Sequence, residues 1–154
     1  MIPVERERLI QLFEQLYDGT PWLDVNIVDT LEQLSAEQAG RKVRPDIHSV
    51  WEITHHLIAW RENVLQRLHG AVINTPADNF FRPINDVSPE AWQATLRRLK
   101  QSQDDWMRYL QQSTEASWHQ VYPTNGMTYF EQIHGILQHD AYHLGQIRLL
   151  LRIN

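Results

Sequence analysis

Two histidines four residues apart, His139 and His143, are the side chains in this sequence best placed to do chemistry. In a helix, residues at i and i+4 lie on one face with their Cβ atoms about 6 Å apart. Both imidazoles can therefore turn onto a single ion, as in the first half of a zincin motif. A third histidine from another helix would complete a three-His site that leaves one coordination position open.

An apolar stripe at helical spacing carries the candidate for that third ligand. His56 lies in the middle of this stripe, and His55 is its neighbour one position round the helix. A single histidine on such a stripe is more often a hydrogen-bonded core residue than a ligand. Three inner-face histidines are costly to bury unless something satisfies them all, and one divalent cation can do so. Spacing alone leaves the metal site and the hydrogen-bonded core equally open.

Carboxylates near these histidines are possible partners for the imidazole N–H groups, as around most metal-bound histidines. Asp140 follows His139 where zincins carry a Glu general base, but it points about 100° away round the helix. It could serve as a base, or it could instead contact another ligand or another chain. Glu52 lies one turn before His56, although a capping box with Ser49 already engages it.

Several further residues around the histidines have both a functional and an ordinary reading. Gln146 follows His143 by three positions and could bind a site water or ligand, or simply be solvated. His48 could line the mouth of a cleft. Gly145, which costs a helix roughly 1 kcal/mol relative to Ala, predicts close approach of a neighbouring helix or room near the site. We expect Tyr142 and Trp22 to be packing residues.

Four long helices are needed to position these side chains, and periodicity with end signals predicts them. We expect them over residues 4–17, 49–69, 88–112 and 128–153, the last three with clear capping residues at their starts. Shorter helical pieces are expected at 26–34 and 35–40, the second ending at Gly40 as a C′ residue. Loops are expected at 70–87 and 113–127, and the first is long for a compact domain, which is typical of a lid or site wall. The third helix carries an apolar seam interrupted by one polar residue, Gln103. With no strand-like alternation, the sequence predicts an all-α, up-and-down four-helix bundle forming a single domain over 1–154.

Composition excludes several other classes of protein. The net charge is −5 and no basic block is present, so the features of a nucleic-acid binder are missing. No apolar run approaches a membrane span, and the N-terminus becomes charged too early for a signal peptide. There is no cysteine, which removes disulfides and thiolate ligands and leaves histidines and carboxylates as the strong metal ligands. We expect a cytoplasmic protein.

The chain resembles the DinB/YfiT-like family of metal-binding four-helix bundles. The resemblance is carried by residues 49–60 (SVWEITHHLIAW) and 139–147 (HDAYHLGQI), and the turns at 19–22 and 126–128 also fit. It covers essentially the whole chain. It implies a metal triad of His56, His139 and His143, because the family has a His followed by Leu in the second helix.

The resemblance also implies a function. A three-His site with an open position suits Zn²⁺, Ni²⁺, Fe²⁺ or Mn²⁺ and permits hydrolysis or thiol transfer. Some relatives look like hydrolases, and others like S-transferases or isomerases that use bacillithiol, mycothiol or glutathione. Arg41, Lys42 and Arg44 could hold the carboxylates of such a thiol, or be solvated. The alternative is a non-catalytic bundle that binds a small molecule or acts in a stress response. A homodimer formed through aromatic-rich helix faces is expected.

Overall fold

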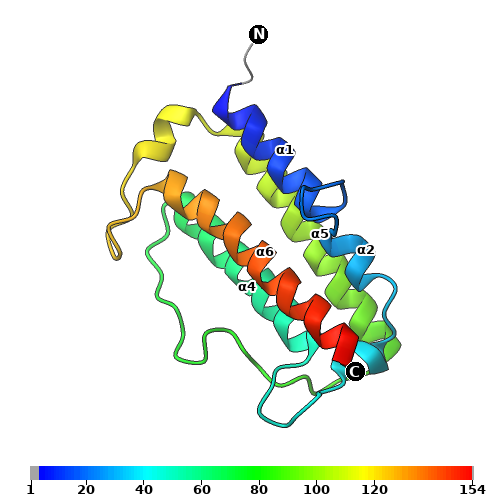
Figure 1. Ribbon diagram of the computed structural model, residues 1–154. Helices are drawn as coiled ribbons and strands as arrows, with labels where there is room; N and C mark the ends of the chain where they lie inside the picture. Colours follow the sequence, from blue (N-terminus) through cyan, green and yellow to red (C-terminus); the bar gives the residue numbers. More distant parts are fainter. Residues whose placement is uncertain (1–3, 154) are drawn as a thin grey trace.

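The bundle is built from four long helices that lie alongside one another (Figure 1). The computed structural model describes residues 4–153, and its long helices are α1 (Glu5–Tyr17), α4 (Val50–Leu68), α5 (Pro89–Gln112) and α6 (Tyr129–Ile153). Helix α4 packs against both α5 and α6, and α1 packs against α5. The predicted all-α bundle is confirmed, with helix bounds within about two residues of those expected.

Shorter elements fill the connections between the long helices. They are α2 (Ile27–Leu31), α3 (Ala36–Gly40) and a 3₁₀ turn, η1 (Glu115–His119), which lies within the predicted loop 113–127. Within residues 4–153 the extended pairing is limited to one isolated bridge between Val121 and Thr128. The other long loop, residues 70–87, runs along the α4 side of the bundle (Figure 1).

Capping boxes fix where the two histidine-bearing helices begin. At the start of α4, the Ser49 N–H donates to Glu52 Oε2 at 2.8 Å, and the Glu52 N–H donates to Ser49 Oγ at 3.1 Å. At the start of α6, the Thr128 N–H donates to Glu131 Oε2 and the Glu131 N–H donates to Thr128 Oγ1. Each box provides hydrogen-bond acceptors for backbone N–H groups that have no partner within the helix. The starting points of α4 and α6 therefore follow from the local sequence, and they determine which face of each helix carries the histidines.

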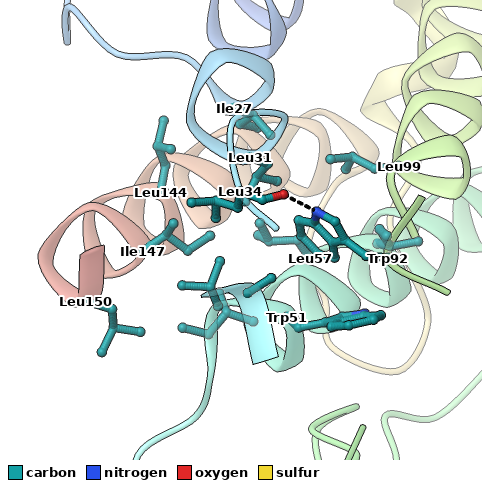
Figure 2. Packing of buried hydrophobic residues seen from close by; sticks show 14 of the residues in the cluster. Ile27, Leu31, Leu34, Trp51, Leu57, Trp92, Leu99, Leu144, Ile147 and Leu150 are labelled. Atoms are coloured by element: carbon teal, nitrogen blue, oxygen red, sulfur yellow. Dashed lines mark hydrogen bonds between the residues drawn. The ribbon is translucent and has the colours of Figure 1, made fainter. Parts of the chain in front are cut away.

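Tryptophans anchor one end of the core (Figure 2). The Trp92 indole N–H donates to the Leu34 carbonyl at 3.0 Å, and its ring meets the Trp51 ring edge-on with centroids 5.1 Å apart. Both tryptophans are buried, and leucines and isoleucines of α2, α4 and α6 surround them. The bond to Leu34 ties the chain between α2 and α3 to helix α5, which closes this end of the bundle.

The polar residue in the α5 seam has a partner across the core. Gln103 is buried, and its side-chain oxygen accepts a hydrogen bond from Arg61 of α4. A buried amide is tolerated when it is hydrogen-bonded, so Gln103 is part of an α4–α5 contact rather than a break in the seam.

Three expectations about individual residues are wrong, and a fourth is decided between its two alternatives. Trp22 and Tyr142 do not pack, because they are 95% and 64% exposed. At Gly145 the alternative of room, rather than close approach of a neighbouring helix, agrees with the structure, since among residues 4–153, apart from its own helix backbone and chain neighbours, nothing lies within 4 Å of the position that a Cβ would take there. Gly40 is the last residue of α3 rather than a left-handed C′ residue, a conformation that Gly70 does adopt, with a φ of +94°. The homodimer remains a prediction.

None of the helices in residues 4–153 combines the length and apolar character that crossing a membrane needs.

The Trp92 anchor gives a test of the core. Trp92→Phe should lower the free energy of unfolding by roughly 2 kcal/mol, because it removes packed volume and leaves the buried Leu34 carbonyl without its donor. The matched control is Trp22→Phe at the most exposed tryptophan, which should change stability by less than about 0.5 kcal/mol. Urea unfolding followed by circular dichroism measures both. Equal effects from the two variants would contradict this view of the core.

Candidate metal centre

Three imidazoles from two helices meet inside the bundle. His56 comes from α4, and His139 and His143 come from α6. One ring nitrogen from each residue lies within 4.8 Å of the other two, and the Nε2 atoms of His56 and His139 are 3.0 Å apart. His56 and His143 are buried, and the His139 side chain is 23% exposed. The predicted triad is thus brought together in space, and it could hold a metal ion.

The loop 70–87 determines which nitrogen of His56 carries the proton. His56 Nδ1 lies 2.7 Å from the backbone carbonyl oxygen of Asn79. Because a carbonyl only accepts, Nδ1 must be the donor, and a neutral ring then has its lone pair on Nε2. Burial is the main cause that lowers the pKa of His56 to about 4. The neighbouring histidines lower this pKa further, whereas the hydrogen bond to Asn79 acts in the opposite direction. His56 is therefore neutral at physiological pH, with Nε2 free to bind a cation.

Gln146 plays the corresponding part for His143. Its side-chain oxygen lies 2.7 Å from His143 Nδ1, while its amide nitrogen donates to the Tyr142 hydroxyl at 2.9 Å. With the amide in this orientation, Nδ1 donates and Nε2 keeps the lone pair. Burial lowers the pKa of His143, and the nearby His139 lowers it further. Gln146 therefore orients the histidine itself, a role that neither prediction for this residue included.

Asp140 faces the back of His139 rather than the centre of the cluster. One carboxylate oxygen, Oδ2, lies 3.3 Å from Arg61 in an ion pair that is almost completely buried. The other, Oδ1, lies 3.9 Å from His139 Nδ1, and within residues 4–153 neither of these two atoms has a hydrogen-bond partner. The negative charge favours a proton on Nδ1, which again leaves the lone pair on Nε2. This position is unsuited to a general base acting at an open coordination position, so that reading of Asp140 is wrong.

The donor set fits a divalent cation. Nδ1 of His56 and Nδ1 of His143 are each hydrogen-bonded to an acceptor, and Nδ1 of His139 faces a carboxylate 3.9 Å away, an arrangement that favours three Nε2 lone pairs inside one small volume. If His139 instead donated from Nε2 to His56, its Nδ1 lone pair would face the Asp140 carboxylate, which is electrostatically unfavourable. A cation between the rings removes that conflict. Three neutral imidazoles are a common ligand set for Zn²⁺ and related metals.

The remaining histidines lie outside the cluster. His55 turns toward α5, where its Nε2 lies 3.0 Å from Thr95 Oγ1 and 3.2 Å from the Trp51 indole nitrogen. The choice between His55 and His56 as the helix-α4 candidate therefore falls on His56. Glu52 is engaged by its capping box and by Lys42, 3.1 Å away, so it does not contact His56.

Aromatic side chains from the loop 70–87 cover the centre. The Phe81 ring stacks on His56 with centroids 3.9 Å apart, and His48 stacks on Phe81 at the same distance. Phe80 meets Trp60, whose ring lies 5.9 Å from that of His139. Asn79 and Phe80 have positive φ values of 49° and 62°, a conformation that costs free energy in residues other than glycine. This backbone arrangement holds the Asn79 carbonyl on His56, and the loop is a site wall, as its length predicted.

Two cavities flank the three histidines. The larger, about 510 Å³, is mostly apolar and lies at His143, with Ile53, Phe81 and Leu150 among its walls and His48 at its side. The smaller, about 250 Å³, lies at His139. The prediction that His48 lines a cleft agrees with this position.

The neighbouring histidines provide a direct test of the ligand assignment. His56→Ala should weaken Zn²⁺ binding by more than about 100-fold, since removing a ligand costs more than removing a partner of a ligand. His55→Ala, the matched control, should bind Zn²⁺ as the wild type does. Competition with a chromophoric chelator measures both affinities, and circular dichroism checks the fold. Loss of binding in His55→Ala with retention in His56→Ala would contradict the assignment.

A comparison with known families finds a match over most of the chain. The model of the DinB superfamily matches residues 25–147, a span that includes all three histidines of the cluster. No curated protein and no solved structure gives a significant match.

Proposed function

Because the chain belongs to the DinB superfamily and gathers three imidazoles in its core, we propose that it is a divalent-metal-dependent enzyme. The reaction is hydrolysis or S-transfer from a low-molecular-weight thiol. The observation that carries this proposal is the convergence of three ring nitrogens within 4.8 Å beside a cavity of about 510 Å³.

The chain's own residues would hold the ion and prepare the site. His56, His139 and His143 would be the ligands, with Asn79, Asp140 and Gln146 beside their Nδ1 atoms. Three ligands leave a coordination position open for a water or a substrate atom. When bound, a divalent ion supplies Lewis acidity there, which activates a water or a thiol. Zn²⁺, Ni²⁺, Fe²⁺ and Mn²⁺ are all candidates for such nitrogen donors.

The larger cavity would bind the substrate. Its walls are mainly apolar, so burial of a hydrophobic group there would contribute affinity. His48 in this wall lies 3.6 Å from a Glu52 carboxylate oxygen and is half exposed. An imidazole beside a carboxylate can accept a proton from a reacting group and release it to solvent. His48 is therefore the residue in the cavity wall best placed to move a proton.

The basic connector gives less support to thiol binding than its sequence suggested. Arg44 pairs with Asp46 at 3.0 Å, and Lys42 pairs with Glu52 at 3.1 Å. Two of the three cations proposed to hold a thiol's carboxylates are therefore already engaged. Thiol transfer rests on the open metal position rather than on this segment.

A paired assay tests the enzymatic proposal. The protein, loaded in turn with each of the four metals, is given chromogenic esters, and separately 1-chloro-2,4-dinitrobenzene with glutathione, bacillithiol or mycothiol. We expect metal-dependent turnover in one panel, and His139→Ala should reduce it at least about 100-fold with the helical content kept, because one ligand is lost.

His134→Ala, at a histidine on the same helix outside the cluster, is the control and should retain activity. Turnover that persists in metal-free protein or in His139→Ala would refute a metal-dependent reaction. Metal binding without turnover in either panel would favour the non-catalytic, ligand-binding alternative.

A further inference from the structure

One buried cation in helix α4 has no anionic partner among residues 4–153. Arg67 is 7% exposed, and its guanidinium lies over the rings of Trp60 and Tyr122, 5.5 and 5.1 Å from their centroids. One terminal nitrogen donates to Thr75 Oγ1 at 3.2 Å, but Nε has no acceptor within the part of the chain that the structure describes. Arg61, two turns earlier, pairs with Asp140. Buried charges are almost always paired, so Arg67 is the exception that needs a reason.

A second unpartnered group lies in the wall of the same cavity. Gln132 of α6 is 4% exposed, and neither its amide nitrogen nor its amide oxygen is hydrogen-bonded to any residue in 4–153. It lines the cavity of about 250 Å³ together with Arg67 and His139. Leaving such an amide buried and unsatisfied is costly, so two independent side chains present unused donors at one place.

The cavity offers positive charge without any carboxylate in its described lining. Its other walls include Trp60, Val64 and Ile136, which are apolar or aromatic. A guanidinium presents a planar pair of N–H donors that matches a carboxylate, and one guanidinium balances one negative charge. The rings of Trp60 and Tyr122 restrict the Arg67 guanidinium, so less side-chain entropy is lost when a ligand binds to it.

We propose that this cavity is a subsite for a carboxylate group of the substrate, bound by Arg67 and Gln132. His139 is shared between the cavity and the three-His cluster, so a carboxylate held here lies beside the metal centre. The substrate class is then a carboxylic acid whose reacting atom lies a short chain away from the carboxylate. The link to the reaction rests on the proposed function, whereas carboxylate binding by Arg67 does not.

The first experiment needs no metal. Full-length ¹⁵N-labelled protein, stripped with a chelator, is titrated with butyrate or with butyramide, which has nearly the same shape but no charge. The Nε–H signal of Arg67, identified by its loss in Arg67→Met, should shift and saturate with butyrate and not with butyramide. If butyrate leaves the signal unmoved, or both compounds shift it equally, the subsite proposal is overturned.

The second experiment relates the subsite to the metal. Zinc-loaded protein is titrated with a series of hydroxamates of increasing chain length that end in a carboxylate, and with the matching carboxamides. At the best length the carboxylate should bind about 10-fold or more tightly than its carboxamide, as expected for a charged hydrogen bond. Arg67→Met should abolish this preference, because it weakens carboxylate binding much more than carboxamide binding. A carboxylate preference that survives in Arg67→Met would overturn the assignment.

Control variants and outcomes distinguish failure of the carboxylate subsite from failure of the metal-dependent function. Arg98→Met removes one positive charge at a half-exposed position on α5 and should keep the preference. If Arg67→Met does not fold, Gln132→Leu takes its place. Gln132→Leu should reduce the preference for the carboxylate over the carboxamide. Equal binding of both hydroxamates at every length refutes the subsite next to the metal but not the metal site. Binding of neither hydroxamate, with the Arg67 signal still responding to butyrate, refutes the metal-dependent function but not the carboxylate site.

Discussion

The packing of α4 against α6 is the contact on which the rest of this site depends. It places His56 Nε2 3.0 Å from His139 Nε2, with His143 one helical turn further along. With a proton on each Nδ1, the three Nε2 lone pairs in so small a volume do not stabilise one another. The surrounding structure must therefore hold them in place, and it does so through contacts to the opposite nitrogen of each ring.

Those outer contacts come from three different kinds of group. His56 is oriented by a backbone carbonyl in a loop and His143 by a side-chain amide on its own helix, whereas Nδ1 of His139 lies 3.9 Å from a buried carboxylate. That carboxylate, on Asp140, is itself held by Arg61, which also donates to Gln103. Gln103, Arg61 and Asp140 thus form one chain of contacts from α5 through α4 to α6. The buried charges of Arg61 and Asp140 are thus paired with each other inside a core otherwise rich in tryptophan and leucine.

The sequence was sufficient for the helices and for the three histidines, but not for what surrounds them. Helix starts follow from local capping residues such as Ser49 with Glu52, and the inner-face histidines follow from helical periodicity. The contact from Asn79 could not be predicted, because a backbone carbonyl carries no residue-specific signal and the loop 70–87 has no period. Arg67 and Gln132 were missed for another reason. Each looks like an ordinary helix residue, and their burial without partners appears only when α4, α6 and the loops are assembled.

The most direct test of this account is a crystal structure of the zinc-loaded protein with data collected at energies on both sides of the zinc absorption edge. One anomalous peak per chain should lie between α4 and α6, bonded to Nε2 of His56, His139 and His143 at about 2.0–2.1 Å. A zinc ion bound elsewhere, or bonded through an Nδ1 atom of these histidines, would contradict it.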